Sequence, residues 1–146
     1  MSQVLSAFEQ FGPEKFSEMV CGMAPYFSTI NPEFIALRAG YSEARVKKVR
    51  AIENHLGTVH AIAMCNAAEL VGGTLTDASL PEGCRWIPKA MNVQYLAKAK
   101  TDIRAVASAD GVDFSEPGDK SVAVDIFDEA GTKVFHADII MDVRKA

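Results

Sequence analysis

One acidic residue stands out among the side chains that could do chemistry. Glu69 lies within a run of small and apolar residues, 61–73, in which Asn66 is the other strongly polar side chain. A carboxylate in such a segment is costly to bury without a partner, and ionisable groups in apolar clefts are enriched at functional sites. Glu69 is therefore a candidate catalytic residue. The alternative is that it closes a buried polar network or faces a subunit interface.

A polar loop precedes this run. Residues 54–60 have the sequence Asn-His-Leu-Gly-Thr-Val-His. We expect Thr58 to cap the following helix, because its hydroxyl can accept a free N–H group of the first turn. His60 lies nine residues before Glu69, which at about 100° per residue is half a turn away around the helix. The two side chains therefore cannot form a dyad on one face, and joint action requires a ligand, a second element or a second subunit.

Composition limits the kind of protein. The chain has 146 residues, 49% of them apolar, and a net charge of −4, which indicates one globular domain and no general attraction to nucleic acid. Its cysteines, Cys21, Cys65 and Cys84, are widely spaced, which favours a reducing compartment over a disulfide framework or a zinc site. Residues 1–10 lack the pattern of a secretion signal. We expect a cytoplasmic protein with no metal, no membrane association and no nucleic-acid partner.

Hydrophobic periodicity predicts the elements that position these residues. Helical spacing predicts two short helices, 2–11 and 13–23, which we expect to brace or cover the main domain. Alternation predicts one extended segment, 33–50, before the central helix. It predicts four strands after that helix, at 85–100, 101–109, 121–127 and 133–143. Short connections between successive strands favour an antiparallel sheet with the helix on its concave face.

The chain thus divides into a helical extension, 1–32, and a core, 33–146. Pro88 predicts a bulge near the start of its strand, and residues 128–131 (Asp-Glu-Ala-Gly) predict a hairpin turn. His136 is expected to point outward from its strand.

Three further sets of residues each allow two interpretations. A cationic cluster is either a solvated strand face or a phosphate-binding patch for a ligand such as coenzyme A; it comprises Arg45, Lys47, Lys48 and Arg50. Large apolar residues are candidates for an apolar pocket or for plain core, namely Met23, Phe27, Met64 and Trp86. Within the polar loop, Asn54 and His55 are either functional or loop-closing residues.

The loop and helix together resemble hotdog-fold thioesterases related to phenylacetyl-CoA thioesterase. That family carries an Asn, a Gly and a His before the helix and an acidic residue nine positions after the His, which here are Asn54, Gly57, His60 and Glu69. The resemblance implies an α+β hotdog fold, in which an antiparallel sheet wraps around one long central helix, with short N-terminal helices outside the pattern.

Two other stretches resemble a little-characterised bacterial branch of that family. They are residues 85–91 (Arg-Trp-Ile-Pro-Lys-Ala-Met) and the turn at 128–131. With them, the resemblance covers residues 33–143. One departure stands within the motif, because the family usually places Gly-Gly directly after the His, where this chain has Ala61-Ile62.

The resemblance also implies an activity, hydrolysis of an acyl-CoA thioester to the free acid and CoA without a cofactor. Glu69 would act as general base on water or as nucleophile. Asn54 would position the water or the carbonyl, and backbone N–H groups at the helix N-terminus near His60 would polarise the thioester. Substrate-binding positions would be Gly57, Thr58, Ala61 and Asn66.

The same resemblance implies a homo-oligomer, either a dimer or a dimer of dimers, with the active site at the subunit interface. Two alternatives stay open. One is a hotdog hydratase or dehydratase that pairs His55 with Glu69, and the other is a non-catalytic acyl-CoA-binding protein. A serine hydrolase is disfavoured, because the chain has no G-x-S-x-G sequence.

Overall fold

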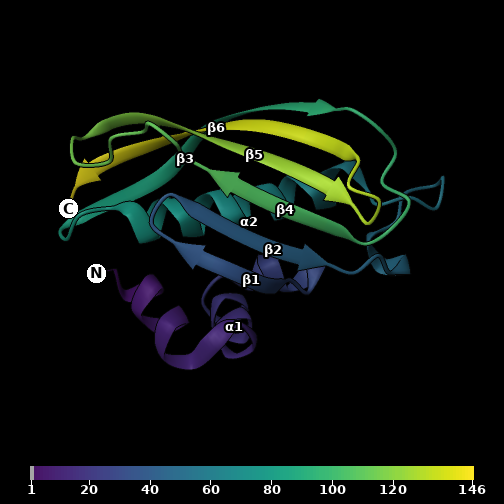
Figure 1. The fold of residues 1–146 in the computed structure, drawn as a ribbon, viewed down its shortest axis with the longest axis horizontal. Coiled ribbons are helices and arrows are strands. Elements are labelled where there is room, and N and C mark those ends of the chain that lie inside the picture. The colour runs from purple at the N-terminus through teal and green to yellow at the C-terminus, as the bar shows by residue number, and fades with distance from the viewer. Residues whose placement is uncertain (1) are drawn as a thin grey trace.

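An antiparallel sheet curves around one long helix in the computed structural model, which describes residues 2–146 (Figure 1). The strands are β1 (Glu33–Arg38), β2 (Tyr41–Val46), β3 (Cys84–Tyr95), β4 (Ile103–Ser108), β5 (Gly118–Asp128) and β6 (Lys133–Lys145). Their spatial order is β1-β2-β4-β5-β6-β3, and all pairings are antiparallel. This arrangement confirms the predicted α+β hotdog fold, with β1 and β3 as the edge strands.

The central helix α2 (Ala61–Ser79) fills the concave side of the sheet (Figure 1). Ala67, Ala68 and Val71 are completely inaccessible to solvent, because small side chains let the sheet approach the helix closely. The opposing strands alternate as predicted, and on β6 the residues Phe135, Ala137, Ile139, Met141 and Val143 are all buried. The first turn of the helix is less buried, and Ile62 is exposed there.

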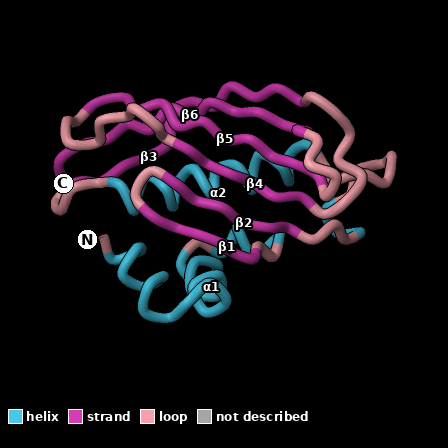
Figure 2. Tube along the Cα trace, in the orientation of Figure 1, coloured by secondary structure: helices cyan, strands magenta, loops and turns pink. Residues whose placement is uncertain are grey.

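The N-terminal segment packs outside the sheet, beside β1 (Figure 2). Helix α1 (Gln3–Met23) is two helical pieces joined by a kink at Gly12, where φ is 82°, and this confirms the two predicted helices. A short 3-10 helix, η1 (Pro25–Ile30), follows. The Ser17 hydroxyl accepts a hydrogen bond from the Phe34 N–H at 2.9 Å, and this bond ties α1 to β1.

The prediction of one extended segment before the central helix is wrong. The predicted extended segment, 33–50, contains a hairpin of β1 and β2 over residues 33–46, because Gly40 has φ of 78° and turns the chain between them. The sheet consequently has six strands where five were predicted. The central helix also continues beyond the small and apolar run, which ends at residue 73, as far as Ser79.

Two local features of the strands agree with expectation. The register between β3 and β6 shifts between Pro88 and Ala90, which confirms the predicted bulge. Residues 128–131 turn tightly between β5 and β6, and the Gly131 N–H donates to the Asp128 carbonyl at 3.0 Å. β3 ends earlier than predicted, at Tyr95, and β5 begins earlier, at Gly118.

Within residues 2–146, neither helix combines the length and the apolar character required to cross a membrane.

Candidate active site

Glu69 lies on the face of α2 that the sheet leaves uncovered. Gly73 and Asp77 follow it at four-residue intervals, and this spacing places all three on one side of the helix. They line a cavity of about 420 Å³ whose other walls come from α1, η1 and Trp86 of β3. Met23 and Phe27 also line it, as the pocket interpretation requires, whereas Met64 is buried core.

The Glu69 carboxylate is half-buried in these surroundings. It makes no hydrogen bond or ion pair with any residue between 2 and 146. The structure therefore does not support a closed buried network around Glu69. A carboxylate that is free to accept a proton or attack a carbonyl is what a general base or nucleophile requires.

Asp77, at the other end of the same face of α2, already has a hydrogen-bond partner. Its carboxylate accepts a hydrogen bond from the Trp86 indole N–H at 3.2 Å. The indole ring also lies directly over Gly73, where an added Cβ would stand 2.7 Å from the ring carbon Cη2. Sequence analysis missed Gly73 and Asp77 as site residues. The spacing of Glu69, Gly73 and Asp77 was the available signal.

The cap of α2 differs from the prediction. His60 is the N-cap residue, and its Nδ1 accepts a hydrogen bond from the Ile62 N–H at 3.0 Å. Thr58 lies two residues earlier and does not cap the helix. Because Nδ1 is an acceptor, a neutral His60 ring carries its proton on Nε2, and that N–H is a donor.

The amide groups at the start of α2 are partly occupied. The His60 N–H donates to the Ile52 carbonyl at 2.8 Å, and the Ile62 N–H donates to the His60 ring. Ala61 is the first helical residue, and an N–H at this position has no acceptor within its own helix. Ala61 therefore offers the amide most suited to bind a developing oxyanion.

Asn54 closes the polar loop. Its Oδ1 accepts from the N–H groups of Leu56 and Thr58, at 3.0 and 3.1 Å, and its Nδ2 donates to the Thr58 hydroxyl at 2.8 Å. These bonds form around Gly57, whose φ of 75° suits glycine. One amide hydrogen of Asn54 remains for another acceptor. His55 is exposed in this loop.

Asn66 lies in a second, smaller hollow together with His60. This hollow has a volume of about 200 Å³. Asn66 is 7% exposed, and its Nδ2 donates at 3.1 Å to Thr29 Oγ1, which in turn donates to the Tyr26 carbonyl. The Asn66 Oδ1 atom is buried and has no hydrogen-bond partner in the part of the chain that the structure describes.

The predicted site residues thus fall into two groups. Asn66, His60 and Ala61 gather around the start of α2, whereas Glu69 opens into the larger cavity. Ala61 and Glu69 are eight residues apart, which is about 12 Å along a helix. This separation agrees with the expectation that His60 and Glu69 form no dyad within one chain.

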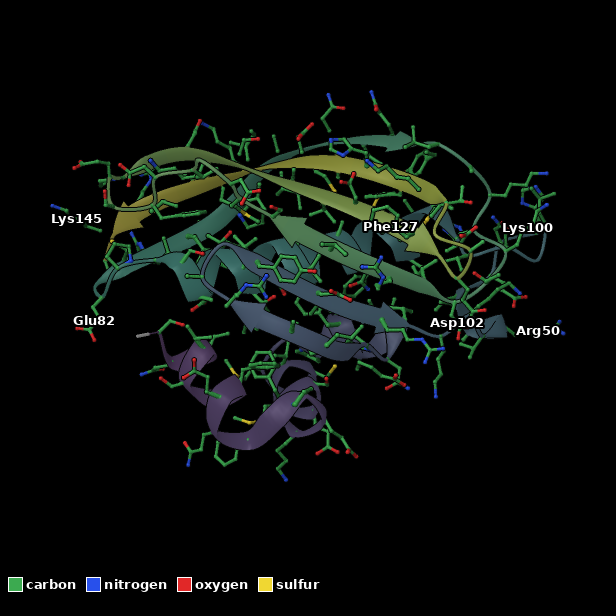
Figure 3. The ribbon with its side chains drawn as sticks, in the orientation of Figure 1. Arg50, Glu82, Lys100, Asp102, Phe127 and Lys145 are labelled. Carbon is green, nitrogen blue, oxygen red and sulfur yellow. The ribbon has the colours of Figure 1, made fainter. Side chains whose placement is uncertain are left out.

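The cationic cluster is largely neutralised by carboxylates. Arg45 contacts Asp102 at 2.7 Å, Lys47 contacts Glu33 at 3.4 Å, and Lys48 contacts Glu53 at 2.8 Å. The Lys48 backbone N–H, followed by Arg45, holds the pKa of Asp102 below its ordinary value. Figure 3 shows Asp102 and Arg50 at the same end of the molecule. The geometry favours a solvated, ion-paired face over a phosphate-binding patch.

Comparison with known proteins places the chain in a family. The model of the "Domain of unknown function (DUF4442)" matches residues 12–143. The chain belongs to this family. A structural-genomics target, APC5556, has a crystal structure that matches with 49% identity and a TM-score of 0.90, over 99% of this chain and 97% of that chain. No curated protein is similar enough in sequence to count as a match.

Solved structures with lower identity share the fold of this DUF4442 protein. Thioesterase HI1161 from Haemophilus influenzae is 17% identical, with a TM-score of 0.76 over 87% of each chain. A thioesterase family protein from Silicibacter pomeroyi is 13% identical, with a TM-score of 0.77 over 89% of this chain and 96% of that chain. At these identities the likeness establishes the hotdog fold, and the activity must be argued from the site.

Proposed function

We propose that the protein is an acyl-CoA thioesterase in which Glu69 is the general base or nucleophile. The observation that carries this proposal is the half-buried Glu69 carboxylate, which has no partner within residues 2–146 and borders an apolar cavity. An apolar cavity with few polar groups is the usual form of a small-molecule site. Neither a metal nor a cofactor takes part in the proposed reaction.

The reaction needs two groups that act on one thioester. As general base, Glu69 removes a proton from water while the water oxygen bonds to the carbonyl carbon, and the carbonyl oxygen becomes an oxyanion. The oxyanion is bound by the Ala61 N–H and by the Nε2–H of His60. When the carbon–sulfur bond breaks, the proton held by Glu69 passes to the leaving thiolate. Asn54 holds the loop that places His60.

These two groups must come from different subunits. The Ala61 N–H and Glu69 of one chain are about 12 Å apart along α2, which is too far for one carbonyl group. Two antiparallel α2 helices around a two-fold axis would bring Ala61 of one subunit beside Glu69 of the other. Asn66 lines the same hollow as His60 and would then lie beside the substrate's carrier group.

The edge strand β3 is the proposed dimer contact. It is 12 residues long, and its outer edge has no neighbouring strand within residues 2–146. Ile87, Tyr95 and Leu96 are large apolar residues that are exposed along or next to it. A long unpaired edge with apolar side chains is suited to pair with another strand. We expect a dimer, or a dimer of such dimers.

The test is thiol release from acyl-CoAs, followed with a thiol-trapping dye. Wild-type protein should release CoA, and Glu69→Gln should lower the rate by about 100-fold or more, because it removes the base and keeps the shape of the side chain. Glu18→Gln is the matched control, since Glu18 is an exposed carboxylate on α1 that lies outside the Glu69 cavity.

Each other outcome contradicts the proposal. Full activity in folded Glu69→Gln would remove Glu69 from the mechanism. Enoyl-CoA absorbance that falls without release of thiol would replace hydrolysis with hydration. Saturable acyl-CoA binding with no turnover over aliphatic and aromatic substrates would indicate a binding protein.

A further inference from the structure

Helices α1 and η1 turn the uncovered face of α2 into a chamber. The cavity extends along α2 from Glu69 past Gly73 to Asp77, a distance of about 12 Å for eight residues. The wall opposite α2 is apolar, and its larger side chains are Val4, Phe16, Met19, Val20, Met23 and Phe27. Methionine side chains are flexible and adapt to the shape of an apolar ligand.

Apart from Glu69 and the solvent-exposed Gln3, the polar side chains that line the chamber already form hydrogen bonds within the protein. The Thr74 hydroxyl donates to the Leu70 carbonyl at 2.9 Å and also contacts the Ser42 hydroxyl at 2.8 Å. Asp77 is bonded to Trp86, and Gln3 is exposed. A ligand group with a hydroxyl or a charge would lose its water without gaining a partner. The chamber therefore favours a plain hydrocarbon.

Trp86 lines the half of the chamber that is remote from Glu69. Its ring lies against Gly73, at a position that a side chain on residue 73 would occupy, and its N–H is held by Asp77. Beyond it lies a more polar hollow of about 580 Å³, lined by residues 80–85 and sharing Gln3, Asp77 and Trp86 with the chamber. Trp86 is thus a partition between an apolar chamber and a polar groove.

We propose that the chamber takes the unsubstituted aliphatic acyl chain of the substrate and that Trp86 limits the length of that chain. The proposal rests on the thioester being bound at Glu69, as argued for the function. The cavity measures about 420 Å³. If a methylene takes about the 30 Å³ of a water molecule, the chamber holds on the order of ten carbons. The substrate class is accordingly a medium-chain acyl thioester.

Binding can be measured without chemistry, because Trp86 is the one tryptophan of the chain. The probes are S-alkyl-CoA thioethers, which have no hydrolysable bond, with butyl, octyl, dodecyl and hexadecyl chains. Saturable changes in tryptophan fluorescence report the affinity for each probe. The affinity should be highest for the octyl or the dodecyl thioether. Below the limit, each added methylene should tighten binding by about fourfold.

Two variants should move the preferred length in opposite directions. Trp86→Ala joins the chamber to the polar groove, and calorimetry should show the affinity for hexadecyl relative to octyl rising by about tenfold or more. Ala7→Phe places a ring in the chamber from the α1 side and should favour butyl over dodecyl. Phe11→Ala is the matched control, because Phe11 is an exposed aromatic residue of α1 that does not line the chamber and lies away from the proposed dimer contact.

The outcomes separate this proposal from the proposed function. Length-dependent thioether binding that both variants shift, without hydrolysis of any thioester, supports the chamber and overturns the thioesterase assignment. Hydrolysis with a length profile that neither folded variant changes overturns the chamber and leaves the thioesterase assignment intact. Tighter binding of S-(phenylethyl)-CoA than of every alkyl probe also overturns the aliphatic assignment.

Discussion

Glu69 and Asp77 are carboxylates on one face of α2, about two helical turns apart, and their partners separate their roles. Asp77 accepts the indole N–H of Trp86, so it has a structural task. Glu69 has no partner within residues 2–146. A carboxylate left in this way in an apolar cavity is costly unless a ligand uses it, and this difference directs the catalytic proposal to Glu69.

His136 provides a prediction about pH at the level of a single residue. It lies on the outer face of β6, as predicted, and its ring contacts Asp125 at 2.7 Å and Asp138 at 3.1 Å. The hydrogen bond to Asp125, with a smaller contribution from Asp138, raises the pKa of His136 above 6.5 although partial burial opposes the shift. The protonated ring is therefore favoured in the folded state.

When the pKa of a group is higher in the folded than in the unfolded state, its protonation stabilises the folded state. This stabilisation is complete at pH values below the pKa of the unfolded state and is lost as the pH rises through the pKa of the folded state. The difference in unfolding free energy between wild type and His136→Asn should therefore be largest below pH 6.5 and shrink above it. Urea denaturation over a range of pH measures this difference. Asp125→Asn should also flatten the profile, and a difference that grows with pH would contradict the assignment.

At the residue level, the sequence alone can single out a residue whose chemistry is unusual for its surroundings. Glu69 stands out in any apolar run, whatever the fold. The cap was missed because Ser, Thr, Asn and Asp lead the N-cap preferences, and Thr58 offered such a residue two positions before His60. In the structure the Thr58 hydroxyl accepts from Asn54. A loop that closes on itself was therefore mistaken for the start of a helix.

At the level of elements, α1 is the part of the molecule that creates the chamber. Gly12 and Pro13 divide it into two pieces, and both pieces contribute residues to the chamber wall, such as Val4 and Val20. The sharp change of direction needs a positive φ, which costs other residues about 1–2 kcal/mol. The kink is thus a requirement for the shape of the chamber.

Two glycines of α1 should respond in opposite ways to the same substitution. Gly12→Ala should destabilise the protein by about 1–2 kcal/mol, because φ at Gly12 is 82°. Gly22→Ala should stabilise it by about 0.5 kcal/mol, since Gly22 is helical and nothing lies within 4 Å of the added Cβ. Chemical denaturation measures both. Equal changes in the free energy of unfolding for the two variants would show that the kink does not require glycine.

Element boundaries were harder to predict than element types. The Gly12-Pro13 pair divided α1 correctly, because both residues interrupt a helix. The β1–β2 hairpin was missed because β1 does not alternate regularly, and the register between the two strands shifts between Phe34 and Ala36. The chamber could not be predicted from sequence, because its walls meet only when α1, η1, α2 and β3 pack together.

At the scale of the whole molecule, the proposed active site is incomplete within a single chain. The Ala61 N–H and Glu69 are about 12 Å apart in one subunit, and the edge strand β3 is unpaired within residues 2–146. A two-fold dimer through β3 would resolve both features together. The proposed function and the proposed assembly therefore both require the same arrangement of two α2 helices.

Subunit complementation tests this arrangement directly. Ala61→Pro removes the amide hydrogen at the first helical position, where proline is tolerated, and the extended ψ of 139° at His60 suits a residue before proline. Ala61→Pro and Glu69→Gln should each be nearly inactive. When the two variants are mixed and refolded together, half of the dimers are hybrids with one intact site, so about a quarter of wild-type thiol release should return. Each variant refolded alone is the control. No recovery from hybrids that form, as judged by mass spectrometry, would place both groups in one chain and remove the shared site.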